Sequence, residues 1–481
     1  MSGVVTPQSD PIPNVLAQRY ASDDMATVWS PRGKVVRERR LWLAVLEAQR
    51  DLGVAVPDGV VEAYEKVVDD VDLASIDARE RVTRHDVKAR IEEFCALAGH
   101  EHIHKAMTSR DLTENVEQAQ VRDALIVVRD RMVAALARLA EQAAEHAGLV
   151  MVARTHNVAA QATTMGKRFA TAGEELLVAL GRVEELLARY PLRGLKGPVG
   201  TSADQLDLLG GDAERLEQLE VAVAQRLGFA DHLASVGQVY PRSLDLDVVA
   251  ALVQAAAGPA NLATTIRLMA GHDLATEGFA PGQVGSSAMP HKTNTRSCER
   301  IAALATVLRG HLAMVADLAG TQWNEGDVSC SVVRRVALPD AFFTVDGLFE
   351  TFLHVLHGFA AHRGAIEAEL GRELPNLATT RILVAAVRAG LGREQAHALI
   401  QGHALDAAAA RRAGQGDGDL LARLAADDRI PLDRTALDAL VADPGAFVGA
   451  GPRQTATFVE RVAEVTARHP GAAAYTPGPL L

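Results

Sequence analysis

A glycine-containing segment at residues 285–294 (GSSAMPHKTN) carries two adjacent hydroxyls, a cation and an amide. The hydroxyls belong to Ser286 and Ser287, the cation is Lys292 and the amide is Asn294. These groups suit binding a carboxylate and removing a proton from the carbon next to it, because the cation and the amide stabilise the negative charge that develops. Glycine and proline exclude a regular helix through residues 280–294. A surface loop of ordinary polar residues is the alternative, but the whole decapeptide is more specific than a pair of serines.

A second candidate for proton transfer is His156, within the sequence RTHN at residues 154–157. The apolar spacing that follows predicts that His156 stands at the N-terminus of a long helix. There the helix dipole lowers the pKa of an imidazole, which suits a group that donates a proton readily near neutral pH. A capping or core histidine is the structural alternative. Thr155 and Gln161 accompany His156 in this stretch.

Two further segments carry groups that suit anions. Thr108 and Ser109 precede a helix that we expect to open at Asp111, where free backbone N–H groups can receive an anion. Plain helix capping is the alternative, and both roles are compatible. Near the N-terminus, Arg19 and Tyr20 form a pair that can hold a phosphate through a charge-assisted bond and a phenolic hydroxyl.

Long helices must position these groups. Apolar residues recur at alternating steps of four and three, which predicts one long helix with a narrow seam. The members of this seam are Val158, Ala162, Met165, Phe169, Ala172, Leu176, Ala179, Val183 and Leu186. Further long helices are predicted near residues 112–139, 248–270, 297–318 and 332–359, and shorter helices with Asp/Gly/Pro loops follow residue 362. An all-α, elongated bundle that associates into oligomers is therefore expected.

Composition limits the functions that fit. The 481 residues carry a formal net charge of -12, which disfavours generic nucleic-acid binding but not a small anionic substrate. Three cysteines and no CxxC spacing predict neither a disulfide framework nor a zinc site, and they suit a cytoplasmic protein. The HEHIH stretch at residues 100–104 has ligand-type side chains, but its mixed spacing disfavours zinc. The sequence has no apolar run long enough to predict a membrane span, and its N-terminus has no apolar core of the kind found in signal peptides.

The decapeptide at residues 285–294 resembles the signature loop of the fumarase/aspartase superfamily, and motifs in the same order extend the resemblance from about Arg19 to Pro339. The resemblance implies an enzyme that cleaves a C–N or C–O bond β to a carboxylate without a cofactor or metal. It implies three helical domains, which we place at residues 1–108, 109–361 and 362–481. It also implies a homotetramer with active sites shared among three subunits.

Within that superfamily the chain resembles the adenylosuccinate lyases, which release fumarate from succinylated purine nucleotides. The resemblance makes His156 the general acid and Ser286 the general base, with Ser287 as the second candidate for the base. It assigns substrate contacts to Arg19, Tyr20, His85, Asp86, Thr108, Ser109, Thr155, Gln238, Lys292, Asn294, Arg300, Ser331 and Arg335. Gly326 replaces an arginine of many relatives, so one phosphate ligand is missing or is supplied elsewhere, for example by Arg296 or Arg334.

Two rival functions remain open at the level of sequence. Another lyase of the superfamily, such as an argininosuccinate lyase or a carboxymuconate-type cycloisomerase, would have no use for the phosphate-type contacts of Arg19, Tyr20 and Arg335. A non-catalytic structural protein with the same bundle would have no need to keep Ser286, Lys292, Asn294 and His156 together. Both features favour the nucleotide lyase.

Overall fold

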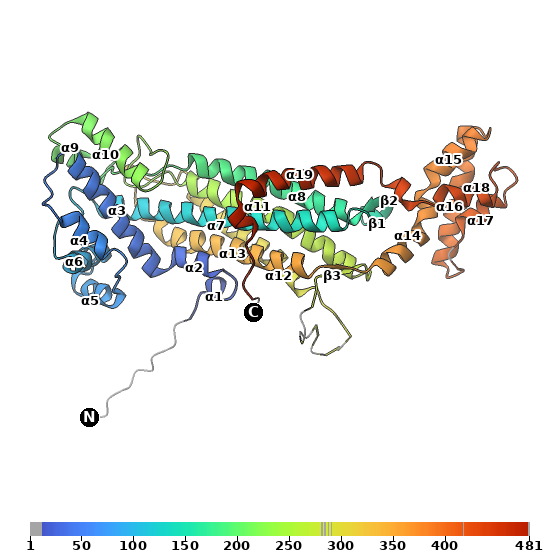
Figure 1. The fold of residues 1–481 in the computed structure, drawn as a ribbon, viewed down its shortest axis with the longest axis horizontal. Coiled ribbons are helices and arrows are strands. Elements are labelled where there is room, and N and C mark those ends of the chain that lie inside the picture. Colours follow the sequence, from blue (N-terminus) through green and yellow to red (C-terminus); the bar gives the residue numbers. More distant parts are fainter. Residues whose placement is uncertain are drawn as a thin grey trace, which may run out of the picture.

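The computed structural model describes residues 12–479, apart from residues 280, 281, 283, 284, 287, 290 and 417. Five long helices run along the longest axis of the molecule and form its central bundle (Figure 1). They are α7 (Ser109–Glu145), α8 (Met165–Arg189), α11 (Ser243–Ala270), α12 (Arg296–Leu318) and α13 (Cys330–Gly358). The predicted all-α architecture is confirmed, since the described strands form only two short two-stranded sheets.

The seam predicted on α8 holds from Met165 onward. Met165, Phe169, Leu176, Val183 and Leu186 are all buried in the main hydrophobic core. Because these positions recur every three or four residues, they form one stripe that packs against α7 and α11. Burial of this stripe is what holds α8 in the bundle.

The first part of the seam prediction is wrong. Residues 158–164 do not begin the helix but form strand β2 (Val158–Thr164), which pairs in antiparallel fashion with β1 (Val150–Thr155). Val158 is exposed, and Ala162 pairs with Val152 across the hairpin instead of extending the helical stripe. The second sheet pairs β3 (Ala275–Thr276) with β4 (Ala360–Ala361), strands that α12 and α13 separate in the sequence.

Smaller helices gather at the N-terminal end of α7, except α1 (Val15–Arg19) and α2 (Asp23–Trp29), which lie along the side of the bundle against α13 and α7 (Figure 1). The helices at that end are α3 (Pro31–Asp51), α4 (Val60–Lys66), α5 (Leu73–Thr83), α6 (Asp86–Ala98), α9 (Ala203–Leu208) and α10 (Ala213–Arg226). Trp42 and Tyr64 anchor α3 and α4 in the same hydrophobic core as the long helices. This core therefore continues from the N-terminal helices into the bundle.

The C-terminal helices divide between two cores. They are α14 (Arg363–Leu377), α15 (Thr379–Arg388), α16 (Arg393–Arg412), α17 (Leu420–Ala425), α18 (Arg434–Val441), the 3-10 helix η1 (Pro444–Phe447), α19 (Gly451–Arg468) and α20 (Pro470–Ala473). Ile382, Ile400, Leu424 and Leu437 belong to a separate small core, whereas Phe458 of α19 joins the main core beside α7 and α8. The division at residues 108/109 and 361/362 stays a prediction.

Two helices of the described chain, α11 and α12, are long and apolar enough to cross a membrane by length and composition alone. α11 packs against α8, α12 and α13 inside the bundle. A core helix of a bundle has the same composition as a membrane span, so this feature is weak evidence for membrane insertion.

Candidate active site

The segment at residues 285–294 closes on itself in the structure. Asn294 Nδ2 donates a hydrogen bond to Gly285 O at 2.9 Å, and Ser286 Oγ accepts one from Met289 N at 3.1 Å. A Cβ atom on Gly285 would lie 2.5 Å from Lys292 O, so the close approach of the two ends requires glycine. Ser286, Lys292 and Asn294 are therefore brought into one compact turn. Ser287, the second candidate for the base, lies outside the described residues.

A buried carboxylate, Glu277, holds the far end of this loop. Its two oxygens accept hydrogen bonds from Ser297 N and Cys298 N, each at 2.9 Å, at the first turn of α12. A carboxylate at a helix N-terminus satisfies free N–H groups and interacts favourably with the helix dipole. Sequence analysis missed Glu277, because its partners lie 20 and 21 residues further along the chain.

Replacing Glu277 with alanine is expected to lower the free energy of unfolding by about 1–2 kcal/mol, the usual cost of losing a helix cap. Glu277→Gln should fall between wild type and Glu277→Ala, because its amide oxygen still accepts a hydrogen bond. The midpoint of thermal unfolding at one fixed protein concentration checks this ranking. Equal midpoints for all three proteins would contradict the capping role.

Tyr20 and Arg300 meet in the structure. The Arg300 guanidinium lies over the Tyr20 ring, 5.5 Å from its centroid. Tyr20 follows α1 and packs closely on α13 at Gly347, where a Cβ atom would lie 2.7 Å from Tyr20 Cβ. Arg19 is exposed at the end of α1. Two of the predicted substrate ligands are thus adjacent although 280 residues separate them in the printed sequence.

His156 stands at the tip of the β1–β2 hairpin, exposed, beside the exposed Thr155. Thr155 pairs with Val158, which leaves His156 and Asn157 as a two-residue turn with φ of 51° and 61°. Positive φ at both positions is typical of a type I′ hairpin turn, and it is unfavourable for histidine. The predicted helix N-terminus is wrong here: α8 begins only at Met165, so the helix-dipole argument does not apply to His156.

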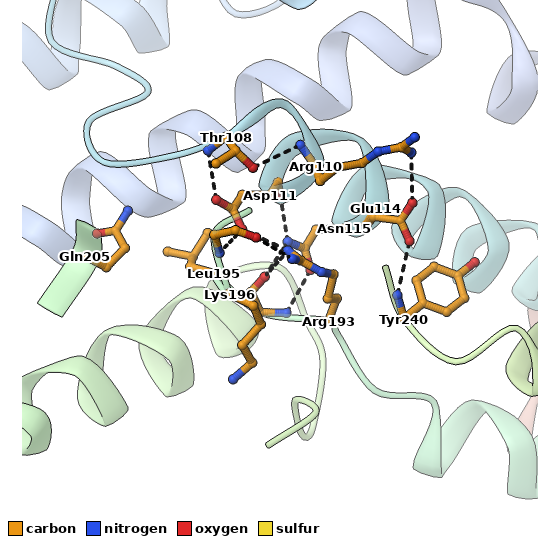
Figure 2. A network of polar contacts seen from close by, with 12 residues as sticks. Thr108, Arg110, Asp111, Glu114, Asn115, Arg193, Leu195, Lys196, Gln205 and Tyr240 are labelled. Atoms are coloured by element: carbon orange, nitrogen blue, oxygen red, sulfur yellow. Dashed lines mark hydrogen bonds and ion pairs between the residues drawn. The ribbon is translucent and has the colours of Figure 1, made fainter. Parts of the chain in front are cut away.

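Helix α7 begins at Ser109, and Thr108 stands directly before it, as labelled in Figure 2. Thr108 is the N-cap: its Oγ1 accepts from Arg110 N at 3.3 Å, and its own N–H donates to Asp111 Oδ2 at 2.9 Å. This corrects the predicted helix start at Asp111, which is instead the third residue of α7. Asp111 supplies the second half of a capping box, because its side chain accepts the hydrogen bond from the backbone N–H of Thr108, three residues earlier.

Asp111 is buried and fixes the cap to a neighbouring loop (Figure 2). Its Oδ1 accepts from Arg193 Nη1 at 2.8 Å and from Gly197 N at 2.9 Å. Arg193 Nη2 in turn donates to Gly237 O at 3.0 Å, directly before Gln238. Buried charges persist only when paired and hydrogen-bonded. The network therefore sets the position of Gln238 relative to the Thr108 cap.

Gln238 lies half-buried against the segment that carries Glu325. Gln238 N donates to Glu325 O at 2.5 Å, and a Cβ on Gly237 would lie 2.0 Å from that same oxygen. Gly326 has a φ of 122°, a conformation that favours glycine, and its Cβ would lie 3.2 Å from Val239. An arginine at position 326 would therefore need a different local backbone.

Ser331 and Arg335 lie on the first turns of α13, with Arg335 exposed. Arg334, between them, is buried and engaged: it donates to Asp245 Oδ2 at 2.8 Å and also pairs with Glu117 and with the Tyr240 hydroxyl. The suggestion that Arg334 supplies the missing phosphate ligand is therefore wrong. A fully paired buried guanidinium has no donor directed at a ligand.

His85 is the N-cap of α6, where its Nδ1 accepts from Lys88 N at 3.3 Å. Asp86 follows it and pairs with Arg90 at 3.0 Å. Burial by itself would raise the pKa of the Asp86 carboxyl, but Arg90, the Val87 N–H and nearby cations together outweigh burial and hold that pKa below its usual range. Asp86 is thus an ionised neighbour of His85.

His104 is a half-buried acceptor close to His85. Trp42 Nε1 donates to its Nδ1 at 3.0 Å, and burial lowers the pKa of His104 to about 4, with a further lowering by His85. The folded state therefore binds this proton more weakly than the unfolded chain, whose histidine pKa is about 6.5. A proton is taken up by this histidine on unfolding. The free energy of unfolding is therefore undiminished above pH 6.5 and decreases as the pH falls towards 4.

Acidification is therefore expected to destabilise wild type by up to about 3 kcal/mol through His104. His104→Asn keeps an acceptor for Trp42 but does not titrate. Its free energy of unfolding should therefore decrease less than that of wild type when the pH is lowered from about 7 to about 4.5. Thermal midpoints of both proteins at the two pH values check this difference. Parallel losses in the two proteins would contradict the role of His104.

One group of the described residues has the spacing of metal ligands: Glu217, Glu220 and His232. Glu220 already accepts from Lys196 Nζ at 2.6 Å and from Leu195 N at 2.9 Å. A cation there would have to displace the lysine, so this group is better explained as an ion-pair cluster. It adjoins the loop of Arg193, because Glu220 binds the two residues Leu195 and Lys196 of that loop.

Within one chain the predicted site residues form three separate groups. Thr108, Ser109 and Gln238 gather at the N-terminal end of α7, and His156 and Thr155 lie on the hairpin that follows its C-terminal end (Figure 1). α7 has 37 residues. At 1.5 Å per residue, its ends lie roughly 55 Å apart. The third group is the loop of Ser286, with Arg300 and Tyr20 nearby along α12.

Comparisons with known proteins show the family of the chain. The chain matches the lyase family over residues 26–310 and the adenylosuccinate lyase C-terminus over residues 375–458. It is 36% identical to adenylosuccinate lyase of Saccharomyces cerevisiae, covering 95% of each chain. It is 32% identical to adenylosuccinate lyase of Schistosoma mansoni, covering 93% of this chain and 94% of the other.

Solved structures share the fold. The 3-carboxy-cis,cis-muconate lactonizing enzyme from Pseudomonas putida superposes with a TM-score of 0.81 at 21% identity, covering 94% of this chain and 99% of the other. A fumarate lyase from Mesorhizobium sp. BNC1 gives 0.78 at 20% identity, covering 94% and 100%. With the relatives above, these matches identify the protein as a lyase of the fumarase/aspartase superfamily that belongs to the adenylosuccinate lyase family.

Proposed function

We propose that this enzyme eliminates fumarate from adenylosuccinate to give AMP, and from SAICAR to give AICAR, in purine nucleotide biosynthesis. The observation that carries the proposal is the compact loop of Ser286, Lys292 and Asn294 in a chain of the adenylosuccinate lyase family. Such a loop offers a hydroxyl, a cation and an amide to one substrate carboxylate and the carbon beside it.

In the proposed mechanism Ser286 removes a proton from the carbon β to the substrate nitrogen and next to a carboxylate. The electron pair is held as an aci-carboxylate, stabilised by Lys292, Asn294, Thr108 and Ser109. The C–N bond then breaks, the carbon–carbon double bond of fumarate forms, and His156 protonates the departing nitrogen. Ser286 must ionise for this step, which the nearby Lys292 and backbone N–H groups favour.

The nucleotide end is proposed to contact the remaining site residues. These are Arg19, Tyr20, His85, Asp86, Thr155, Arg300, Ser331 and Arg335, whereas Gln238 is proposed to contact the succinyl part. The adjacency of Tyr20 and Arg300 supports a shared phosphate site, because a phenolic hydroxyl and a guanidinium can donate to the same anion. Arg335 is exposed and can reach a ligand, unlike its buried neighbour Arg334.

A homotetramer with active sites shared among three subunits is part of the proposal. One chain alone leaves Thr108 and His156 at opposite ends of α7, too far apart to contact one small substrate. Exposed apolar side chains on the long helices support association: Val178 on α8, Leu268 on α11, Val307 on α12, and Val332 on α13. Apolar surface of this kind is typical of helix packing between copies.

The division into three domains and a cytoplasmic location also belong to the proposal. A separate hydrophobic core around Ile382 and Leu424 supports an independent C-terminal unit. Three free, buried thiols, Cys95, Cys298 and Cys330, fit a reducing compartment.

An absorbance assay with purified enzyme and adenylosuccinate tests the function. We expect the purine spectrum to change as AMP forms, with fumarate and AMP released in equal amounts. No spectral change with pure, tetrameric enzyme would overturn the proposal. Turnover of argininosuccinate or of a carboxymuconate in its place would favour another lyase of the superfamily.

A further inference from the structure

A cavity of about 410 Å³ lies beneath the hairpin that carries His156. Its walls come from the β1–β2 hairpin, the first turns of α8 and the second half of α11. The proposed mechanism uses none of its cations. Its size is within the range of cavities that hold small organic ligands.

Positive charge gathers in this cavity although the protein as a whole carries a formal net charge of -12. Arg154, Lys167 and Arg168 all line it, and the described lining contains no carboxylate. One carboxylate, that of Glu369, lies close by and is already bound to Arg154. The three cations therefore share a single counter-ion, which leaves excess positive charge in the cavity.

Among the three cations, the lack of a carboxylate partner is clearest for Arg168. Among the described residues it donates one long hydrogen bond, to Val152 O at 3.4 Å, and forms no ion pair. Burial lowers the pKa of its guanidinium, Glu369 partly opposes that effect, and Arg154 lowers the pKa further. A guanidinium held in such a place without its own carboxylate is an unfavourable arrangement unless an anion binds beside it.

Neutral donors and an apolar wall complete the cavity. Thr163 and Asn261 line it with neutral donors, whereas the Thr171 hydroxyl already donates to Lys167 O. Thr163 directly precedes the N-cap of α8, where the positive end of the helix dipole favours an anion, although the first N–H groups of the helix, those of residues 165–167, are bonded within the protein. Leu262 and Met269 supply apolar surface on the α11 side. A ligand with an anionic head and a small apolar body matches both parts.

We propose that this cavity is a second ligand site, separate from the substrate contacts, that binds a phosphate monoester with a small apolar body. The phosphate lies between Arg154, Lys167 and Arg168, and the body lies against α11. Two guanidinium groups and an ammonium suit a dianionic phosphate better than a single carboxylate, because each can donate to a different oxygen.

Occupation of this site is expected to affect the turn of His156. Arg154 Nη1 donates to Asn157 O at 3.4 Å, and Asn157 itself lines the cavity. A phosphate that binds Arg154 therefore acts on the residue directly after His156. This gives the ligand a route to the proposed general acid without contact with the reacting atoms.

Calorimetric titration of the native oligomer with phenyl phosphate tests the proposal. The titration is run with saturating AMP, which occupies the substrate site if the proposed function is right. We expect one phenyl phosphate per protomer to bind, no binding of the uncharged probe phenol, and an affinity at least about tenfold lower in Arg168→Gln. Lys167→Gln, at a more accessible position, should show the same loss, whereas Arg182→Gln on the same helix should not.

Full displacement of phenyl phosphate by AMP would overturn the proposal, since the cavity would then belong to the substrate site. Unchanged affinity in both Arg168→Gln and Lys167→Gln would overturn it as well, as would equal binding of phenol. Failure of AMP itself to bind would count against the proposed function and not against the cavity. In that case the same titration without AMP, compared across the variants, tests the cavity alone.

Discussion

Ser286→Ala is expected to lower kcat by about 10²–10⁴-fold, the usual contribution of a positioned acid or base. The substitution removes the proposed base and one acceptor, since among the described residues Ser286 Oγ accepts one hydrogen bond, from Met289 N. The loop retains its second closure, from Asn294 Nδ2 to Gly285 O. The KM for adenylosuccinate should change far less than kcat, because Lys292 and Asn294 still bind the carboxylate.

Thr293→Ala is the matched control for this experiment, because Thr293 is an exposed hydroxyl in the same loop without an assigned role. We expect it to keep nearly all activity. Steady-state kinetics and the thermal midpoint of each variant separate a chemical effect from unfolding. Near-normal kcat in Ser286→Ala would remove Ser286 from the mechanism and leave Ser287 as the candidate base.

His156→Asn is expected to produce a loss of similar size, about 10²–10⁴-fold in kcat. Asparagine adopts positive φ more readily than histidine, so the turn at 51° and 61° should be kept or even stabilised while the imidazole is lost. A protein with raised or unchanged thermal midpoint and little turnover is the predicted result. This combination distinguishes lost chemistry from a damaged hairpin.

The pH profile of the His156→Asn variant adds a second readout. If His156 donates the proton to nitrogen, the variant should lose the basic limb of the kcat profile that wild type shows. Asn157→Gly serves as the control, because glycine preserves the type I′ turn and leaves the imidazole in place. Full activity in His156→Asn would contradict the assignment of the general acid.

Helix positions were largely predictable, whereas the hairpin was not. The helices near residues 248–270, 297–318 and 332–359 agree with the observed bounds within a few residues, because their apolar positions recur with helical spacing. The strand at Val158–Thr164 contains three alanines and matched the same spacing by coincidence. Pairing with the neighbouring strand β1 through the two-residue turn at His156 and Asn157 overrides that helical preference.

Part of the candidate site could likewise be predicted from the sequence, and part of it could not. Site residues that lie close together in the sequence, such as Ser286, Lys292 and Asn294, could be grouped from the sequence because one short loop carries them all. Partners distant in sequence could not: Glu277 at the start of α12, Asp111 with Arg193, and Arg334 with Asp245 became visible only in the fold. The sequence alone also does not show that Thr108 and His156 lie at opposite ends of α7.

Mixing two inactive variants tests the shared site most directly. Ser286→Ala and His156→Asn subunits, dissociated together and reassembled in equal amounts, should regain roughly a quarter of wild-type activity if each site takes its serine and its histidine from different subunits of a symmetric tetramer. Each variant treated alone should stay inactive. No recovery in mixed tetramers, verified by native mass spectrometry, would contradict an active site built from several chains.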